Sequence, residues 1–298
     1  MKKVIVMKKS LTAIALSSTL LTPAVMAKTL QVVASFTVPA DMARQIGGKY
    51  VDVKSLVGPD GDPHTFEPAP RDSMALAKAD VVIISGLGLE GWMERLIQAS
   101  GYQGKVVVAS TGITPRTMLS DGVKMTDPHA WNSLANGVIY ARNISEGLQK
   151  ADPEDAAAIR KQGEAYIQQL EKLDKQTLAA FANIPVSKRQ VLTSHDAFGY
   201  FGDEYGVKFM SPIGLNTDEE ASASAVAGLI NQLKANHIHR YFIENQTDPR
   251  LVQQIASAAD ASPGGELYPE ALSTTQGPAA TYQQAFELNV RELLKSMQ

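Results

Sequence analysis

The sequence predicts an α/β protein of two lobes, each a mostly parallel four-stranded sheet flanked by helices, joined by one long backbone helix. Short β-rich runs alternate with amphipathic, helix-length stretches in two parts of the chain, a pattern typical of parallel α/β sheets. Runs such as Val81 to Ile84 are apolar on both faces, as in strands covered by helices on both sides. We predict an N-terminal lobe over residues 28–151, a linking helix over 152–184 and a C-terminal lobe over 185–298, each lobe burying its own core.

The strands are predicted where β-branched and apolar residues cluster. In the N-terminal lobe these runs are Leu30 to Ala34, Val51 to Val57, Val81 to Ser85 and Lys105 to Ser110. In the C-terminal lobe they are Gln190 to Thr193, Lys208 to Ser211, Arg240 to Glu244 and Glu266 to Tyr268. Amphipathic stretches between them, such as Asp72 to Lys78, are the predicted covering helices.

The linking helix is predicted from its start signals and its periodicity. Asp152 is a suitable N-cap, Pro153 favours the first helical position, and two acidic residues follow. From Ile159 onward apolar residues recur at helical spacing, with no proline before Pro185. A helix of about 30 residues would be about 45 Å long. Two helices broken near Gly163 are the alternative, since an internal glycine destabilises a helix by about 1 kcal/mol.

The first 27 residues have the three parts of a secretory signal peptide. A lysine-rich start precedes an apolar stretch from Leu11 to Leu21, and small residues at Val25 and Ala27 precede the expected cleavage site. The apolar stretch is shorter than the about 20 residues that a membrane-spanning helix needs, although an uncleaved anchor is the alternative. We expect export to the periplasm as a free protein without a membrane anchor.

Composition excludes several classes of protein. Of the 298 residues, 44% are hydrophobic and 20% charged, which fits a globular protein rather than a disordered or polytopic membrane protein. The net charge is −3 although four lysines lie in the signal segment, so no basic surface for nucleic acid is expected. The chain has no cysteine, which excludes disulfides, thiolate ligands, a catalytic thiol and a lipid-bearing cysteine.

Three of the five histidines lie in loop-like segments beside acidic residues. His64 follows the second predicted strand, His129 precedes a helix, and His195 lies at the carboxyl end of the strand that opens the second lobe. Loops beyond the carboxyl ends of parallel strands form the ligand crevice of open α/β sheets. We therefore expect the three imidazoles to converge in the cleft between the lobes.

Three neutral imidazoles and one carboxylate make a four-ligand set for Zn²⁺. Glu266 and Glu270, in the last strand and its loop, are the candidates for the carboxylate. Glu266 precedes the apolar core of that strand, whereas Glu270 follows it at the carboxyl end, where His195 also lies. We therefore predict a metal site made of His64, His129, His195 and Glu270.

Other polar residues near these segments have less specific interpretations. His237 and His239 alternate as at a strand edge and are predicted to be surface residues, forming an accessory site only if both face the same side. Asp196, Glu67 and Glu244 could accept the outer N–H of a metal-bound imidazole, or could instead cap turns and face solvent.

Four segments resemble motifs of the cluster A zinc/manganese substrate-binding proteins of ABC transporters. These segments are Asp62-Pro63-His64-Thr65-Phe66-Glu67-Pro68, Asp127-Pro128-His129-Ala130-Trp131, Ser194-His195-Asp196-Ala197-Phe198 and Leu267 to Leu272. The resemblance implies a periplasmic receptor that holds one metal ion between two lobes and delivers it to an inner-membrane ABC permease. The chain departs from the family at Asn132-Ser133-Leu134 and at Glu270, where Asp is more frequent.

The ligand set favours zinc as the cargo. Imidazole-rich sites prefer Zn²⁺ to the harder Mn²⁺, and manganese receptors that resemble this chain tend to carry a carboxylate in place of His195. The same receptor role for Mn²⁺ or Fe²⁺ is the alternative. A zinc-dependent hydrolase is the rival from another class, but it would need Glu270 off the metal as a general base, and the chain has no His-Glu-x-x-His motif. We expect a monomeric binding protein rather than an enzyme.

Overall fold

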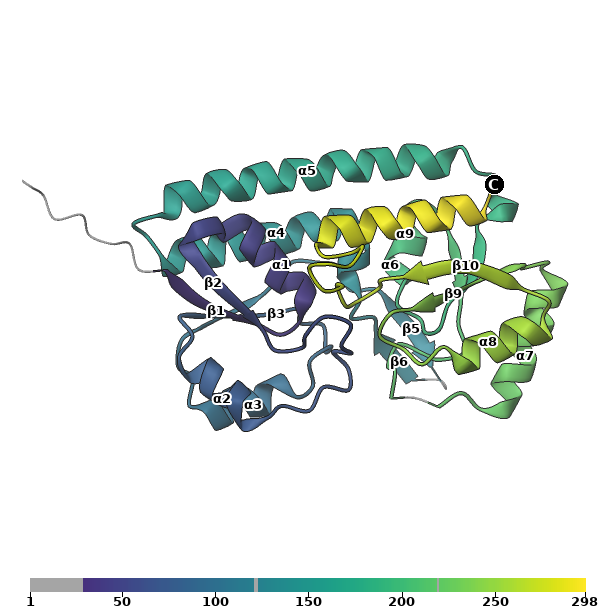
Figure 1. Ribbon diagram of the computed structural model, residues 1–298, viewed down its shortest axis with the longest axis horizontal. Helices are drawn as coiled ribbons and strands as arrows, with labels where there is room; N and C mark the ends of the chain where they lie inside the picture. Colours follow the sequence, from purple (N-terminus) through teal and green to yellow (C-terminus); the bar gives the residue numbers. More distant parts are fainter. Residues whose placement is uncertain (1–28, 121–122, 219) are drawn as a thin grey trace, which may run out of the picture.

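The computed structural model describes residues 29–120, 123–218 and 220–298, so the predicted signal peptide over 1–27 lies outside the described residues. Figure 1 shows two α/β lobes side by side, with helix α5 (Ala156–Ala182) running along both. The predicted fold class is therefore confirmed. Among the described residues, no helix combines the length and apolarity needed to cross a membrane.

The N-terminal lobe contains a sheet in the order β2-β1-β3-β4, in which all neighbouring strands are parallel. Its strands are β1 (Leu30–Ala34), β2 (Val51–Ser55), β3 (Val81–Ile84) and β4 (Lys105–Val108). Its helices are α1 (Thr37–Gly47), α2 (Pro70–Ala77), α3 (Met93–Ser100) and α4 (Leu134–Ala151). Parallel pairing places the carboxyl ends of these strands at one edge, so the segments that follow β2 and β4 leave the sheet on the same side.

The C-terminal lobe repeats this design with the strand order β10-β9-β7-β8, again all parallel. Its strands are β7 (Gln190–Leu192), β8 (Lys208–Met210), β9 (Arg240–Glu244) and β10 (Ser262–Leu267). Its helices are α6 (Gly199–Tyr205), α7 (Ala223–Ala235), α8 (Arg250–Ala258) and α9 (Tyr282–Ser296). Strand β9 therefore lies between β7 and β10, a position that matters for the site.

The last strand begins earlier than the sequence predicts. It starts at Ser262 instead of Glu266, and its register against β9 shifts between Pro263 and Gly265. The residues from Ser262 to Gly265 include no apolar β-former, so the pattern gave no strand signal, and pairing with β9 decides their conformation. Glu266 consequently lies near the carboxyl end of β10 and not at its amino end.

The linking helix also begins later than predicted. The amide of Asp152 bonds to the Leu148 carbonyl and ends α4, while its carboxylate accepts the amide of Asp155 at 3.2 Å. Asp152 thus closes a turn between two helices and is not the N-cap of α5. The helix continues through Gly163, where a Cβ would lie 2.4 Å from Ser145 Oγ of α4. The glycine therefore permits close packing of α4 on α5, and the alternative of two broken helices is wrong.

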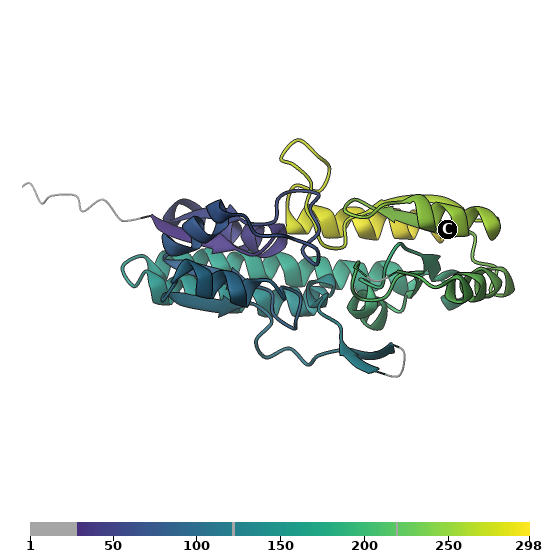
Figure 2. The ribbon, with the colours of Figure 1, turned by 90° about the horizontal axis from the view of Figure 1, so that it is seen from below.

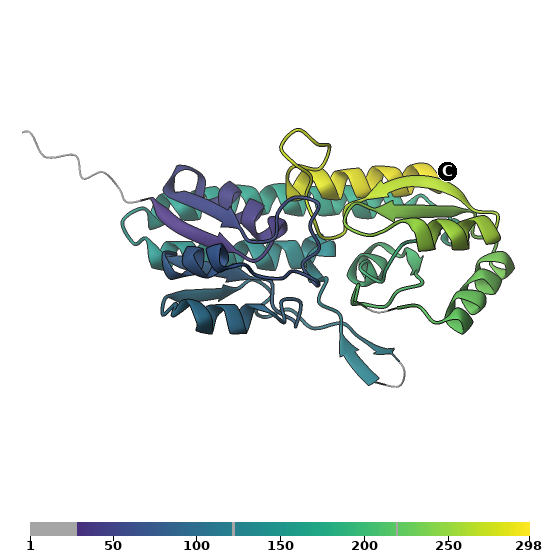
Figure 3. The same ribbon diagram turned by 60° about the horizontal axis from the view of Figure 1, so that its bottom comes forward.

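A short antiparallel hairpin, β5 (Thr117–Ser120) with β6 (Val123–Thr126), was not predicted. Figures 2 and 3 show it projecting away from the N-terminal sheet toward the side of the C-terminal lobe. The sequence did carry one signal, the dipeptide Asp121-Gly122, which is typical of hairpin connections.

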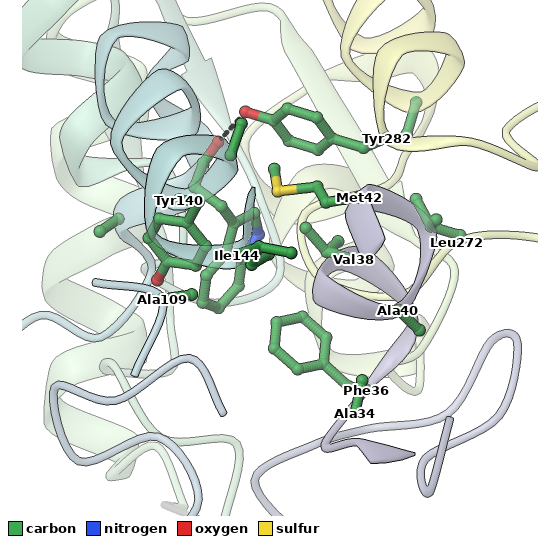
Figure 4. Packing of buried hydrophobic residues seen from close by; sticks show 14 of the residues in the cluster. Ala34, Phe36, Val38, Ala40, Met42, Ala109, Tyr140, Ile144, Leu272 and Tyr282 are labelled. Atoms are coloured by element: carbon green, nitrogen blue, oxygen red, sulfur yellow. Dashed lines mark hydrogen bonds between the residues drawn. The ribbon is translucent and has the colours of Figure 1, made fainter. Parts of the chain in front are cut away.

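The lobes share most of their hydrophobic core. One cluster of buried residues runs through both lobes and includes Val33 of β1 as well as Phe242 of β9. Figure 4 shows Val38 and Met42 of α1 close to Tyr282, which begins α9. A smaller cluster between the C-terminal sheet and helices α7 and α8 is separate. The expectation that each lobe buries its own core is therefore wrong, and the continuous core resists independent movement of the lobes.

Candidate metal centre

The structure brings together the four predicted ligands in the interface between the lobes. The Nε2 atoms of His64 and His129 each lie 2.7 Å from Glu270 Oε1, and His195 Nε2 lies 3.1 Å from the same oxygen. His64 Nε2 and His129 Nε2 are 3.1 Å apart. The segments that carry these residues follow β2, β6, β7 and β10, so both sheets contribute to one cluster.

These distances suit a single small cation. In a tetrahedral site with bonds of about 2.0 to 2.1 Å, neighbouring ligand atoms are about 3.3 Å apart. All four candidate ligand atoms lie within 4.8 Å of one another, and among the described residues theirs is the one such cluster of histidine and carboxylate groups. Each side chain would need to move only a few tenths of an ångström to bind the same ion.

The two histidines of the N-terminal lobe are supported by an aspartate two residues earlier. Asp62 Oδ1 accepts the amide of His64 at 2.8 Å, and Asp127 Oδ1 accepts the amide of His129 at 3.0 Å. Asp127 Oδ1 also lies 2.9 Å from His129 Nδ1. This contact fixes the ring so that Nε2 points toward the cluster.

The two ligands of the C-terminal lobe are supported by residues at the end of β9. Glu244 accepts the amide of Ser194 and lies 2.5 Å from His195 Nδ1. Two residues later, Gln246 Nε2 donates to Glu270 Oε2 at 3.3 Å. The loop of Glu270 is also held across the interface, because Trp131 Nε1 and Asn132 Nδ2 both donate to the Pro269 carbonyl.

The arrangement matches known metal receptors along nearly its whole length. The model of the family described as zinc-uptake complex component A, periplasmic, matches residues 32–296. The chain belongs to this family. The manganese-binding lipoprotein MntA of Bacillus subtilis is 35% identical over 274 residues, covering 90% of each chain. The iron-binding protein YfeA of Yersinia pestis is 30% identical over 92% of this chain and 88% of that protein.

Solved structures show the same likeness for the zinc-uptake component A fold. The periplasmic zinc-binding protein TroA of Treponema pallidum aligns with a TM-score of 0.85 at 27% identity, covering 90% of this chain and 99% of TroA. A manganese-bound periplasmic metal-binding protein of Candidatus Liberibacter asiaticus aligns with a TM-score of 0.82 at 27% identity, with the same coverage. Membership in this family makes the chain a metal-binding receptor of an ABC transport system.

Within this family fold the centre is almost closed to solvent. The side chain of His64 is 6% exposed, and those of His129, His195 and Glu270 are fully buried. A cavity of about 550 Å³ borders His64, with Phe66, Trp92 and Leu215 in its walls. The His64 side is therefore the shortest path from solvent to the cluster.

Burial and charge act in opposite directions on the buried ligands. Burial opposes a charge on the His129 ring, but hydrogen bonds to Asp127 and Glu270 outweigh it and raise its pKa to about 9. His195 behaves likewise, since Glu244 and Glu270 raise its pKa well above 6.5 against the effect of burial. Burial would raise the pKa of Glu270, yet the facing histidines hold it well below 4.5. The cluster is thus organised around the separation of positive and negative charge.

The remaining sequence candidates have different outcomes. Glu244 does contact a ligand ring, whereas Glu67 is exposed and Asp196 makes no hydrogen bond to a ligand ring. Glu266 is exposed and accepts the Tyr268 hydroxyl at 2.8 Å. Asp127 was not predicted as an outer partner, although the repeated Asp-Pro-His pattern of the sequence was a signal for it.

The other two histidines lie outside this centre. His237 and His239 are exposed, as predicted, and precede β9 at its amino end, with their ring centroids 6.3 Å apart. Both border the same small cavity near the C-terminus. They therefore face one side, as an accessory site would require, but among the described residues no third histidine or carboxylate side chain joins them in a cluster.

Proposed function

We propose that this chain binds one Zn²⁺ ion through His64, His129, His195 and Glu270 and delivers it in the periplasm to an inner-membrane ABC permease. The observation that carries the proposal is the convergence of three Nε2 atoms on one carboxylate oxygen in a buried interface. Three imidazoles and one carboxylate are a typical zinc ligand set. The protein acts as a monomer without a membrane anchor.

The alternative cargo is Mn²⁺ or Fe²⁺, because relatives of this chain are a manganese-binding lipoprotein and an iron-binding protein. The ligand chemistry favours zinc, since imidazole nitrogen is a softer ligand than the oxygens that manganese prefers. A hydrolytic role is disfavoured by Glu270, whose Oε1 lies at the centre of the cluster and so would bind the metal instead of serving as a base beside it.

Metal analysis of the protein after native purification tests the choice of cargo. We expect about one zinc per chain, while manganese or iron in that amount would contradict the zinc assignment. Calorimetric titration of His129→Ala tests the ligand set. Zinc affinity should fall by more than the about 100-fold that follows loss of an outer partner, and unchanged binding would remove His129 from the site. A matched control is His237→Ala, which should bind zinc as the unmodified protein does.

A further inference from the structure

The two carboxylate oxygens of Glu270 have different surroundings. Oε1 faces the three imidazole nitrogens at 2.7 to 3.1 Å. Oε2 points away from them and accepts a hydrogen bond from Gln246 Nε2 at 3.3 Å. The side chain of Glu270 is fully buried, so the amide of Gln246 replaces water as the partner of the second oxygen.

Gln246 reaches this oxygen because of the strand order. Strand β9 lies between β7 and β10, and its carboxyl end therefore adjoins both ligand-bearing segments of the C-terminal lobe. A carboxylate can only accept hydrogen bonds, so the amide must present its NH₂ group to Glu270. Among the described residues, the buried Oε1 of Gln246 has no hydrogen-bond partner. Since buried polar atoms without partners are costly and rare, the contact with Glu270 is the polar interaction that this side chain retains.

We propose that Gln246 holds Glu270 in one-oxygen binding and thereby limits the centre to four ligand atoms, which selects Zn²⁺ over Mn²⁺ and Fe²⁺. This inference rests on the proposed function, because it requires the four residues to bind the ion. Zinc in closed sites is four-coordinate and tetrahedral, whereas Mn²⁺ favours octahedral sites rich in oxygen. If Oε2 also turned to the ion, the site would gain one oxygen and one coordination position.

The length of Glu270 makes such a restraint necessary. Glutamate has one more rotatable bond than aspartate, so its carboxylate can swing between one-oxygen and two-oxygen binding more freely. The three imidazoles fix only Oε1, and the hydrogen bond from Gln246 fixes the rotation of the carboxylate about its last bond. Gln246 is thus a positioning residue that sets the number of metal bonds without forming one.

The variant Gln246→Leu tests this inference, because leucine retains much of the volume and removes the donor. Competition titrations with Zn²⁺ and Mn²⁺ should show that the preference for zinc falls by about tenfold or more, within the range known for outer partners of metal ligands. The absorption spectrum of the Co²⁺-loaded protein should change from the intense visible bands of a four-coordinate ion to the weaker bands of higher coordination. A purely structural role of Gln246 would leave this spectrum unchanged.

Gln246→Asn is the second variant, since its amide is one methylene shorter and cannot reach Glu270, and it should show the same change of spectrum if the leucine variant folds poorly. Gln232→Leu, at an exposed position of α7, is the matched control and should behave as the unmodified protein. An unchanged zinc preference and Co²⁺ spectrum in both Gln246 variants would overturn the inference. Failure of the proposed function would differ, because zinc binding would then already be insensitive to His129→Ala in the unmodified background.

Discussion

The two lobes hold their metal ligands in different ways. In the N-terminal lobe, Asp62 and Asp127 support histidines two residues further along the chain. In the C-terminal lobe, Glu244 supports His195 from 49 residues away, and it does so from a neighbouring strand. The N-terminal ligands are therefore oriented by local turns, whereas the C-terminal ligands are oriented only when the sheet has formed.

This difference indicates which half of the centre is more sensitive to change elsewhere in the protein. A short Asp-Pro-His segment keeps its hydrogen bonds as long as its own backbone conformation persists. His195 and Glu270 instead depend on the alignment of β7, β9 and β10. Perturbation at the end of β9 should thus affect two ligands at once.

The largest effect should follow Glu244→Gln. The buried carboxylate of Glu244 accepts the amides of Ser194 and His195 and contacts His195 Nδ1. Removing its charge should reduce zinc affinity by about 10-fold to 100-fold, measured by competition with a calibrated chelator. Asp62→Asn is the N-terminal comparison, since its side-chain oxygen can still accept the His64 amide, and its effect should stay within about 0.5 kcal/mol. Equal losses in the two variants would contradict the contrast between the lobes.

A smaller effect should follow Asn245→Ala, which weakens the contact between the lobes. Asn245 Nδ2 donates to Asp60 Oδ1 at 2.8 Å, in the loop that carries His64, and to the Ala271 carbonyl at 3.1 Å, beside Glu270. Loss of about 1 kcal/mol of net hydrogen bonding corresponds to about fivefold faster metal release. Stopped-flow mixing with excess chelator measures this rate.

Thr247→Ala is the control for that experiment, because the Thr247 hydroxyl bonds to the Glu244 carbonyl within the same lobe. It should leave the release rate nearly unchanged. If Asn245→Ala also left the rate unchanged, the hydrogen bonds between the lobes would have no part in retaining the ion.

The smallest effect concerns the contact between the lobes behind the ligands, where Glu204 of α6 meets the start of α4. Burial, together with the nearby Asp174 carboxylate, raises the pKa of Glu204 from 4.5 to about 7. The unfolded chain loses this proton near pH 4.5, while the folded protein keeps it to about pH 7, so the stability contributed by Glu204 falls as pH rises across this interval. Above about pH 7 both states are ionised and the loss is complete.

Glu204→Gln should remove this part of the pH dependence. Denaturant unfolding of the metal-free protein at pH 5 and pH 8 measures it, with the unmodified protein at both values as the reference. The free energy of unfolding of the variant, relative to the unmodified protein, should increase from pH 5 to pH 8. The effect should be modest because part of the Glu204 side chain remains in contact with solvent. A difference that is constant with pH would show that Glu204 ionises normally.

The sequence predicted most of the fold through patterns that are local. Runs such as Val81 to Ile84 indicated buried parallel strands, and the structure has β3 at those residues. The errors occurred where a residue's conformation depends on a distant partner. Pairing with β9 extends β10 back to Ser262, and packing of Ser145 against Gly163 allows α5 to continue as one helix.

The candidate centre divides in the same way. By itself the sequence determined the chemical types of the four candidate ligands and their places after strands, because Asp-Pro-His turns and strand ends are encoded by neighbouring residues. Only the tertiary structure decided that Glu244 faces His195, that Gln246 faces one oxygen of Glu270, and that Glu266 faces solvent. These contacts join residues on different strands, and their distances depend on strand order and register. Sequence patterns do not specify those quantities, because they are set by the free energy of the whole folded sheet.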